Sequence, residues 1–342
     1  MHNDGELVAV YTQLDKKDFI ALIAEYDLGE FVSFKGIDGG IENTNYFVTL
    51  NNNGHQAEYV LTLFEEFSME DMPFFVELAT WLAERGIPVP APAKDKNGIA
   101  LKKVKGKPAM LQNRFNGQHL DKGQLSVEHC RAIGTKLAQL HVAAQDFFLE
   151  RQSHRGLYWW RRESINIAKY LPAEDVEILT QEVKRFDNLL LKHGEDLPKS
   201  VIHGDLFHDN ALFNGNEIDA IIDLYNAATA FMLFDLAIIA NDWCATADNK
   251  IDNAKEQALL NAYNAVRPFT VTEHTVWPQM TQTAAMRFWL SRLIPAFGVA
   301  QENRDSSEMV IKDPDELKAI LLYRRETPSV LPLNTSSSKA SI

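Results

Sequence analysis

The sequence predicts an α+β chain in two parts, a small antiparallel sheet followed by a larger, mainly helical part. Apolar runs at residues 31–35, 46–50 and 59–64 are separated by turn signals, as is typical of strands joined in hairpins. After about residue 126, apolar residues recur at helical spacing over long stretches. A His-x-Asp-x-x-x-x-Asn run at residues 203–210 lies between two short apolar segments of this second part.

Length and composition limit the possible classes of protein. The chain has 342 residues, enough for one large or two ordinary domains with real cores. A net charge of −13 argues against a nucleic-acid partner, and no apolar run approaches the ~18 residues of a membrane span. We therefore expect a cytoplasmic protein, while the oligomeric state stays open. Cys130 and Cys244 form no ligand cluster, so we expect two buried, inert thiols.

We expect the first part to contain two helices and five strands. Residues 12–15 (Thr-Gln-Leu-Asp) have the pattern of a capping box that opens a helix. Residues 51–54 (Asn-Asn-Asn-Gly) predict a hairpin turn, and residues 71–73 (Asp-Met-Pro) predict the start of the second helix. Strands at residues 99–104 and 109–115 complete the expected sheet.

These elements predict where the chain divides. Residues 1–115 would form the first domain, and residues 116–325 the helical domain that holds the 203–210 run. Residues 326–342, rich in Ser, Thr and Pro, predict a disordered tail.

The residues of the 203–210 run, together with a later aspartate, indicate phosphoryl transfer. Their spacing matches the kinase pattern in which one carboxylate accepts a hydroxyl proton, while an amide and a second carboxylate hold Mg²⁺. Asp205, Asn210 and Asp223 supply these three groups in that order. The alternative interpretation is a surface hairpin with polar loop residues. We favour the first, with Asp205 as catalytic base and Asn210 and Asp223 as Mg²⁺ ligands.

A glycine-rich turn in the first part is a candidate phosphate contact. Gly39 and Gly40 let backbone N–H groups approach a phosphate, and Asn43, Thr44 and Asn45 add side-chain donors. Taken alone, an ordinary hairpin turn is the simpler interpretation. Beside the 203–210 run, we favour contact with ATP.

One position departs from the kinase pattern, which has a lysine in the strand after the hairpin. This sequence has Thr62 there, and a threonine cannot neutralise phosphate charge. The departure keeps open a catalytically inactive, kinase-like binding module.

Several runs resemble one known family. They are Gly36–Tyr46, Tyr59–Glu65, Ala83–Pro88, His203–Phe207, Asp209–Asn210, Asn241–Cys244 and Arg287–Arg292. Together they closely resemble the homoserine kinases of the aminoglycoside-phosphotransferase/choline-kinase-like superfamily. The resemblance implies a two-lobed, protein-kinase-like fold and ATP-dependent phosphorylation of the L-homoserine hydroxyl, in threonine biosynthesis. A threonine at position 62 is also what this branch leads us to expect.

The resemblance further implies roles for individual residues. Thr62 would contact ATP, and Asn113 and Phe115 lie where the fold binds adenine through its inter-lobe hinge. His203 and Asp235 would have structural roles, Asp235 by bonding back to the catalytic loop.

Homoserine is a zwitterion, so its pocket should offer both charges. Arg287 is our candidate for the carboxylate, because a guanidinium binds carboxylates with a planar fork. Asp242 is the candidate for the ammonium group, and Tyr225 and Trp243 are candidate pocket walls. For Arg292 we expect an ordinary ion pair.

Two rival acceptors stay open. A choline or ethanolamine kinase would need an aromatic and acidic pocket for a cation, without a group that binds a substrate carboxylate, and the tryptophans allow such a pocket. An aminoglycoside kinase would use a broad acidic cleft, which the net charge permits.

Overall fold

The computed structural model describes residues 12–37, 43–298 and 312–333, and they form two compact units. The first unit ends at Asn116 and the second begins at Gly117, one residue after the predicted boundary. The first contains the only five-stranded sheet of the described residues, and the second is mainly helical. The prediction of an α+β chain is confirmed.

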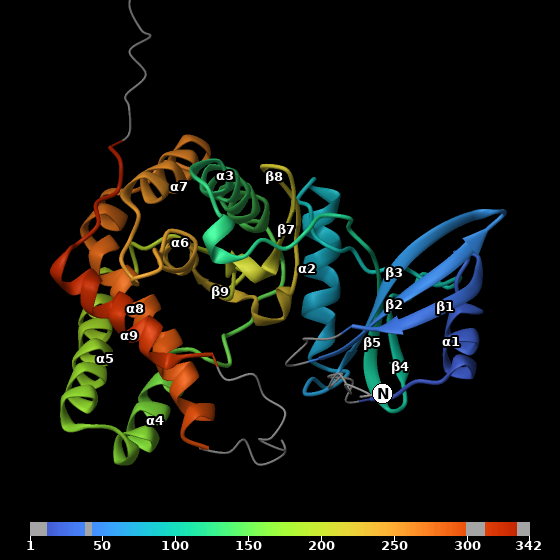
Figure 1. The fold of residues 1–342 in the computed structure, drawn as a ribbon, viewed down its shortest axis with the longest axis horizontal. Helices are drawn as coiled ribbons and strands as arrows, with labels where there is room; N and C mark the ends of the chain where they lie inside the picture. Colours follow the sequence, from blue (N-terminus) through green and yellow to red (C-terminus); the bar gives the residue numbers. More distant parts are fainter. Residues whose placement is uncertain (1–11, 38–42, 299–311, 334–342) are drawn as a thin grey trace, which may run out of the picture. The chain divides into compact units, whose positions relative to one another are not determined.

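The first unit is built on an antiparallel sheet with the strand order β1-β2-β3-β5-β4 (Figure 1). The strands are β1 (Glu30–Gly36), β2 (Asn43–Asn52), β3 (His55–Phe64), β4 (Leu101–Val104) and β5 (Lys107–Asn113). Asn52 pairs with His55, so the predicted hairpin turn is confirmed and consists of Asn53 and Gly54. Its positive φ angles, 52° and 89°, are those that Asn and Gly tolerate best.

Helix α1 (Lys16–Ile23) covers one face of this sheet, where Phe19 packs against Tyr46 in the apolar core. The prediction that Thr12 opens the helix is wrong, because Asp15 is the N-cap. The Asp15 carboxylate accepts the N–H of Asp18, and the Asp18 carboxylate accepts the N–H of Asp15. Helix α2 (Met72–Glu84) begins with a proline in its first turn, as predicted.

The second unit combines long helices with two short β-ribbons (Figure 1). Its helices are α3 (Val127–Ala144), α4 (Leu157–Ile167), α5 (Ala173–His193), α6 (Met232–Asp242), α7 (Asn253–Val266), α8 (Val271–Ala296) and α9 (Pro314–Glu326). The ribbons pair β6 (Lys199–Ile202) with β9 (Ala228–Phe231), and β7 (Ala211–Asn214) with β8 (Glu217–Ile221). Both cysteine thiols are buried, as expected.

The chain after α9 is partly packed. Ser329 and Leu331 are buried, and the Ser329 hydroxyl accepts a hydrogen bond from Trp277 Nε1 at 2.9 Å. The prediction of a disordered tail is therefore wrong for residues 326–333, because Glu326 still belongs to α9, and the buried Leu331 and the Ser329–Trp277 hydrogen bond hold the residues that follow. Residues 334–342 lie outside the described part. In the described ranges, none of the helices has both the length and the apolar character that crossing a bilayer requires.

Candidate active site

The loop at residues 203–210 connects β6 to β7 in the second unit. Its last three residues form a 3-10 turn, η3 (His208–Asn210). Leu206 and Phe207 are buried, whereas Asp205 and Asn210 are half-buried. The apolar side chains therefore anchor the loop, while the polar ones keep access to solvent.

Asp235 on α6 holds the start of this loop. Its Oδ2 accepts the backbone N–H of His203 at 2.8 Å, and its Oδ1 accepts that of Gly204 at 2.9 Å. Nε2 of His141, on α3, donates to the same carboxylate at 3.1 Å. Burial by itself raises the pKa of Asp235, but the hydrogen bonds from His141 and from the His203 backbone outweigh burial and lower that pKa. An ionised carboxylate thus fixes two consecutive peptide groups.

Two hydrogen bonds connect the loop to the segment that carries Asp223. The Ile222 N–H donates to the carbonyl of Asn210 at 3.0 Å, and Nε2 of His203 donates to the carbonyl of Ile222 at 2.9 Å. Asp223 follows directly with φ 62° and ψ 56°, a left-handed conformation that Asp adopts only occasionally. Backbone outliers of this kind cluster at functional sites.

The chemistry of Asn210 and Asp223 fits a hard divalent cation. Asn210 Nδ2 donates to the carbonyl of Asp205 at 2.8 Å, so the amide oxygen is the atom available to a cation. An amide oxygen and a carboxylate are oxygen ligands of the kind that Mg²⁺ and Ca²⁺ prefer. Mg²⁺ commonly takes one or two protein oxygens and completes its shell with water and substrate phosphates.

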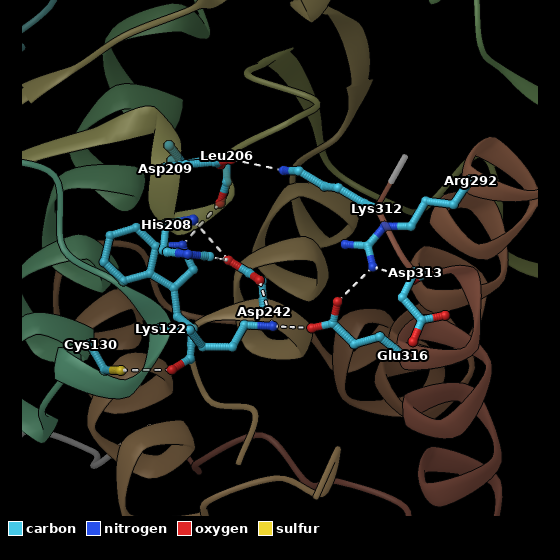
Figure 2. Close-up of polar contacts among 11 residues, drawn as sticks. Lys122, Cys130, Leu206, His208, Asp209, Asp242, Arg292, Lys312, Asp313 and Glu316 are labelled. Atoms are coloured by element: carbon cyan, nitrogen blue, oxygen red, sulfur yellow. Dashed lines mark hydrogen bonds and ion pairs between the residues drawn. The ribbon is translucent and has the colours of Figure 1, made fainter. Parts of the chain in front are cut away.

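A buried ion-pair network holds the other half of the loop (Figure 2). Asp242 Oδ2 accepts both the backbone N–H of His208 at 2.8 Å and its ring Nδ1–H at 2.7 Å. Lys122 Nζ lies 3.0 Å from Asp242 Oδ1. Burial raises the pKa of Asp242, but the His208 hydrogen bond and the Lys122 charge outweigh it and bring that pKa to about 2. Burial lowers the pKa of His208, but the Asp242 carboxylate outweighs it and raises that pKa above the ordinary value.

The residues predicted to bind the acceptor differ in their surroundings. Trp243 is fully buried, and its Nε1 donates to the carbonyl of Leu206 at 3.1 Å. Tyr225 is half-buried in the turn that follows Asp223. Arg287 is 4% exposed, and its Cζ lies 3.8 Å from the ring centroid of Phe288.

Arg292 forms the ion pair expected of it. Its Nη1 lies 2.6 Å from Oε2 of Glu316 and donates to the carbonyl of Asp313 at 2.8 Å. It belongs to the same group of contacts as Lys122 (Figure 2).

The residues predicted to contact ATP lie in the first unit. Asn45 on β2 is directly opposite Thr62 on β3, and the Thr62 hydroxyl donates to Asn45 Oδ1 at 2.7 Å. Thr44 is fully buried and donates to the Glu65 carboxylate at 2.6 Å. Of the other predicted contacts, Asn43 is buried, Asn113 is exposed and Phe115 is half-buried. The two predicted glycines, Gly39 and Gly40, lie outside the described residues.

Sequence reasoning missed His208 and Lys122. His208 lies inside the 203–210 run, but the kinase pattern leaves that position unspecified. Lys122 is 120 residues before Asp242, and a single sequence gives no signal for so distant a pairing. Only the structure shows that Lys122, in the 3-10 turn η1 (Lys122–Gln124), forms an ion pair with Asp242 at the end of α6.

Comparison with known proteins identifies relatives over nearly the whole chain. Residues 33–269 match the phosphotransferase enzyme family. The homoserine kinase of Pseudomonas aeruginosa (strain UCBPP-PA14) is 41% identical over 325 residues, which are 95% of this chain and 99% of that one. The homoserine kinase of Methylobacillus flagellatus is 43% identical over 289 residues, 84% of this chain and 87% of that one. The resemblance read from the sequence is confirmed.

Solved structures show the same fold at low identity. Amicoumacin kinase hAmiN, in complex with AMP-PNP, Ca²⁺ and Ami, superposes with a TM-score of 0.66 and 15% identity, covering 94% of this chain and 96% of that one. The choline kinase from Cryptosporidium parvum Iowa II gives a TM-score of 0.60 at 15% identity, covering 91% and 96%. The predicted kinase-like fold class is confirmed.

Proposed function

The chain belongs to the phosphotransferase enzyme family and within it to the homoserine kinases, and from this we propose its reaction. It transfers the γ-phosphoryl group of ATP to the hydroxyl of L-homoserine, giving O-phospho-L-homoserine for threonine biosynthesis. The observation that carries the proposal is the hydrogen bond from the Ile222 N–H to the Asn210 carbonyl, which connects the 203–210 loop to the segment that contains Asp223. It supports a joint action of Asp205, Asn210 and Asp223.

Asp205 is the proposed base. Its carboxylate would orient the homoserine hydroxyl and accept its proton as the oxygen attacks phosphorus, while the bond to the β-phosphate oxygen breaks. Its backbone is held on two sides, because its N–H donates to His203 Nδ1 at 3.3 Å and its carbonyl accepts from Asn210 Nδ2. Such support favours a fixed carboxylate, and positioning contributes much of the rate in phosphoryl transfer.

Asn210 and Asp223 are the proposed ligands of Mg²⁺. When bound, the cation neutralises charge that develops on the phosphate oxygens. The Asn210 side chain would offer its amide oxygen, since its nitrogen donates to the Asp205 carbonyl. The left-handed backbone of Asp223 turns the chain two residues after the last residue of β8, which supports a role near the end of that strand.

For ATP we retain the contacts predicted from the sequence. Asn45 and Thr62 would act as a hydrogen-bonded pair, in place of the lysine that the kinase pattern has in this strand. Thr44 is the exception, because its fully buried hydroxyl bonds to Glu65 and would support β2 from within the unit. Gly39, Gly40, Asn43, Asn113 and Phe115 complete the proposed set.

For the acceptor, Arg287 is the proposed carboxylate ligand. It stacks on Phe288, whose ring centroid lies 4.6 Å from that of Phe207 in the 203–210 loop. A guanidinium held close to that loop suits a small amino acid whose hydroxyl must reach Asp205. Tyr225, which follows Asp223 by two residues, is the proposed pocket wall. Asp242 and Trp243 hold the loop itself.

An ADP-release assay with homoserine, choline, ethanolamine and kanamycin tests the proposal. We expect turnover with homoserine alone, and a loss of most of kcat in Asp205→Asn with ATP binding retained. Turnover with choline and none with homoserine would overturn the substrate while leaving the fold. Near-normal turnover in Asp205→Asn would overturn the assignment of the base.

A further inference from the structure

A single carboxylate oxygen holds the middle of the 203–210 loop. Asp242 Oδ2 accepts two hydrogen bonds from one residue, the backbone N–H and the ring Nδ1–H of His208, at 2.8 and 2.7 Å. The Asp242 side chain is 3% exposed and that of His208 is 21% exposed. Hydrogen bonds to a buried, ionised carboxylate are stronger than those between neutral groups. His208 therefore cannot move without breaking two strong contacts.

The residue after Asp242, which caps the C-terminal end of α6, holds the loop a second time. Trp243 Nε1 donates to the carbonyl of Leu206 at 3.1 Å, and the indole is fully buried. Asp242 and Trp243 are consecutive in the chain, and they hold loop residues two positions apart. These contacts fall between Asp205 and Asn210, the proposed base and the proposed cation ligand.

Charged side chains outside α6 balance the negative charge of Asp242 (Figure 2). Lys122 Nζ lies 3.0 Å from Asp242 Oδ1 and also forms an ion pair with Glu316 on α9. Glu316 in turn pairs with Arg292 on α8 at 2.6 Å. A buried charge is costly unless it is paired, and these alternating charges offset that cost. They also connect the loop to helices that the catalytic pattern does not include.

We propose that His208 is a positioning residue, which through Asp242 keeps the base and the cation ligand of the loop at a fixed separation during transfer. Asp242 then acts on the reaction through His208, and not as a ligand of the acceptor ammonium. The proposal rests on the function assigned above to Asp205 and Asn210. Loss of this contact would leave the ATP contacts of the first unit unchanged, so its effect belongs in kcat.

The test compares three substitutions in the full-length protein. His208→Ala removes the ring donor. His208→Asn keeps a nitrogen donor at nearly the position of Nδ1. Asp209→Asn is the matched control, because the neighbouring carboxylate pairs with Lys312 at 2.8 Å but is 46% exposed. Exposed ion pairs contribute little.

We expect His208→Ala to lower kcat by about 10- to 100-fold, with KM for ATP within about twofold of wild type. We expect His208→Asn to recover most of the loss and Asp209→Asn to keep wild-type kcat. Amide hydrogen exchange without substrates should accelerate at residues 204–210 in His208→Ala and stay unchanged in the first unit. Turnover is measured with whichever acceptor the wild-type enzyme uses.

Several outcomes would overturn the proposal. They are normal kcat in His208→Ala, an equal loss in Asp209→Asn, or no recovery in His208→Asn. Unchanged exchange in the loop would do the same. The exchange result does not depend on the acceptor, so a failure of the proposed function, seen as a wild-type enzyme without homoserine turnover, is distinguished from a failure of this inference.

Discussion

The imidazole of His203 joins the two segments of the site, because its Nε2 donates to the carbonyl of Ile222 at 2.9 Å. On its other side, Nδ1 accepts the N–H of Asp205 at 3.3 Å. Both bonds require the neutral tautomer with hydrogen on Nε2. Protonation of Nδ1 would place an N–H against the Asp205 N–H. Burial lowers the pKa of His203, although the nearby Asp235 charge opposes this.

This geometry predicts a stability loss in weak acid. The pKa of His203 is lower in the folded state than in the unfolded chain, so below about pH 6.5 the unfolded state binds more protons. The contribution of neutral His203 is therefore fully present above about pH 6.5 and is lost as pH falls. We expect His203→Gln to flatten the pH dependence of the unfolding free energy between pH 7 and 5, by at most about 1.4 kcal/mol per pH unit. Urea denaturation across this range measures it, and a slope equal to that of wild type would contradict the assignment.

Gly204 should resist substitution. Its φ is +78°, and a Cβ there would lie 2.7 Å from the carbonyl oxygen of Asn226. We expect Gly204→Ala to lose about 1–3 kcal/mol of unfolding free energy and more than tenfold in kcat, because the loop must shift away from Asn226 and thereby disturb the Gly204 hydrogen bond to Asp235. Chemical denaturation and steady-state kinetics measure the two effects.

Gly215 provides the matched control. It also has a positive φ, +59°, but a Cβ there would meet nothing within 4 Å. We expect Gly215→Ala to cost about 1 kcal/mol and to leave kcat within about twofold. Equal loss of kcat in the two variants would show that backbone conformation alone, and not contact at the loop, causes the effect.

Asp235→Asn should lower both stability and turnover. The substitution removes the charge that holds two backbone N–H groups and His141, and an amide nitrogen facing one of these donors adds a repulsive contact. We expect a loss of about 3–5 kcal/mol in unfolding free energy. Thermal and urea unfolding measure it. Asp248→Asn is the control and should leave the unfolding free energy nearly unchanged, because the Asp248 carboxylate and its partner Lys250 are both largely exposed.

The parts of the site that the sequence predicted are those whose residues lie close together in the chain. The strand, loop and ribbon order around Asp205 follows from alternation of apolar and turn residues within 25 positions. The support from Lys122 and His141 depends on helix packing and could not be read from local spacing. The sequence places the capping box three residues too early because Thr12 and Asp15 are both good N-caps, and only the structure shows which one bonds to the first turn.

The Thr62–Asn45 pair gives the last prediction, which concerns ATP. Thr62→Val keeps the shape of the side chain but removes the donor to Asn45 Oδ1. We expect KM for ATP to rise about three- to tenfold with kcat nearly unchanged, since a hydrogen bond contributes about 1 kcal/mol and its loss frees the Asn45 amide to turn. Thr62→Ser should behave as wild type. Thr49→Val is the control, because it makes the same change four positions from Asn45 on β2.

The two kinetic constants decide between roles for this pair. If Thr62→Val lowered kcat at an unchanged KM for ATP, Thr62 would act on transfer and not on nucleotide binding, and the proposed contact would be wrong. If Thr49→Val raised KM equally, the effect would come from the sheet as a whole. A rise in KM for ATP that occurs in Thr62→Val, but not in Thr62→Ser or Thr49→Val, would support the proposed role of this pair. A neutral cross-strand hydrogen bond would then order the side chains that contact ATP, at the position where the kinase pattern has a lysine.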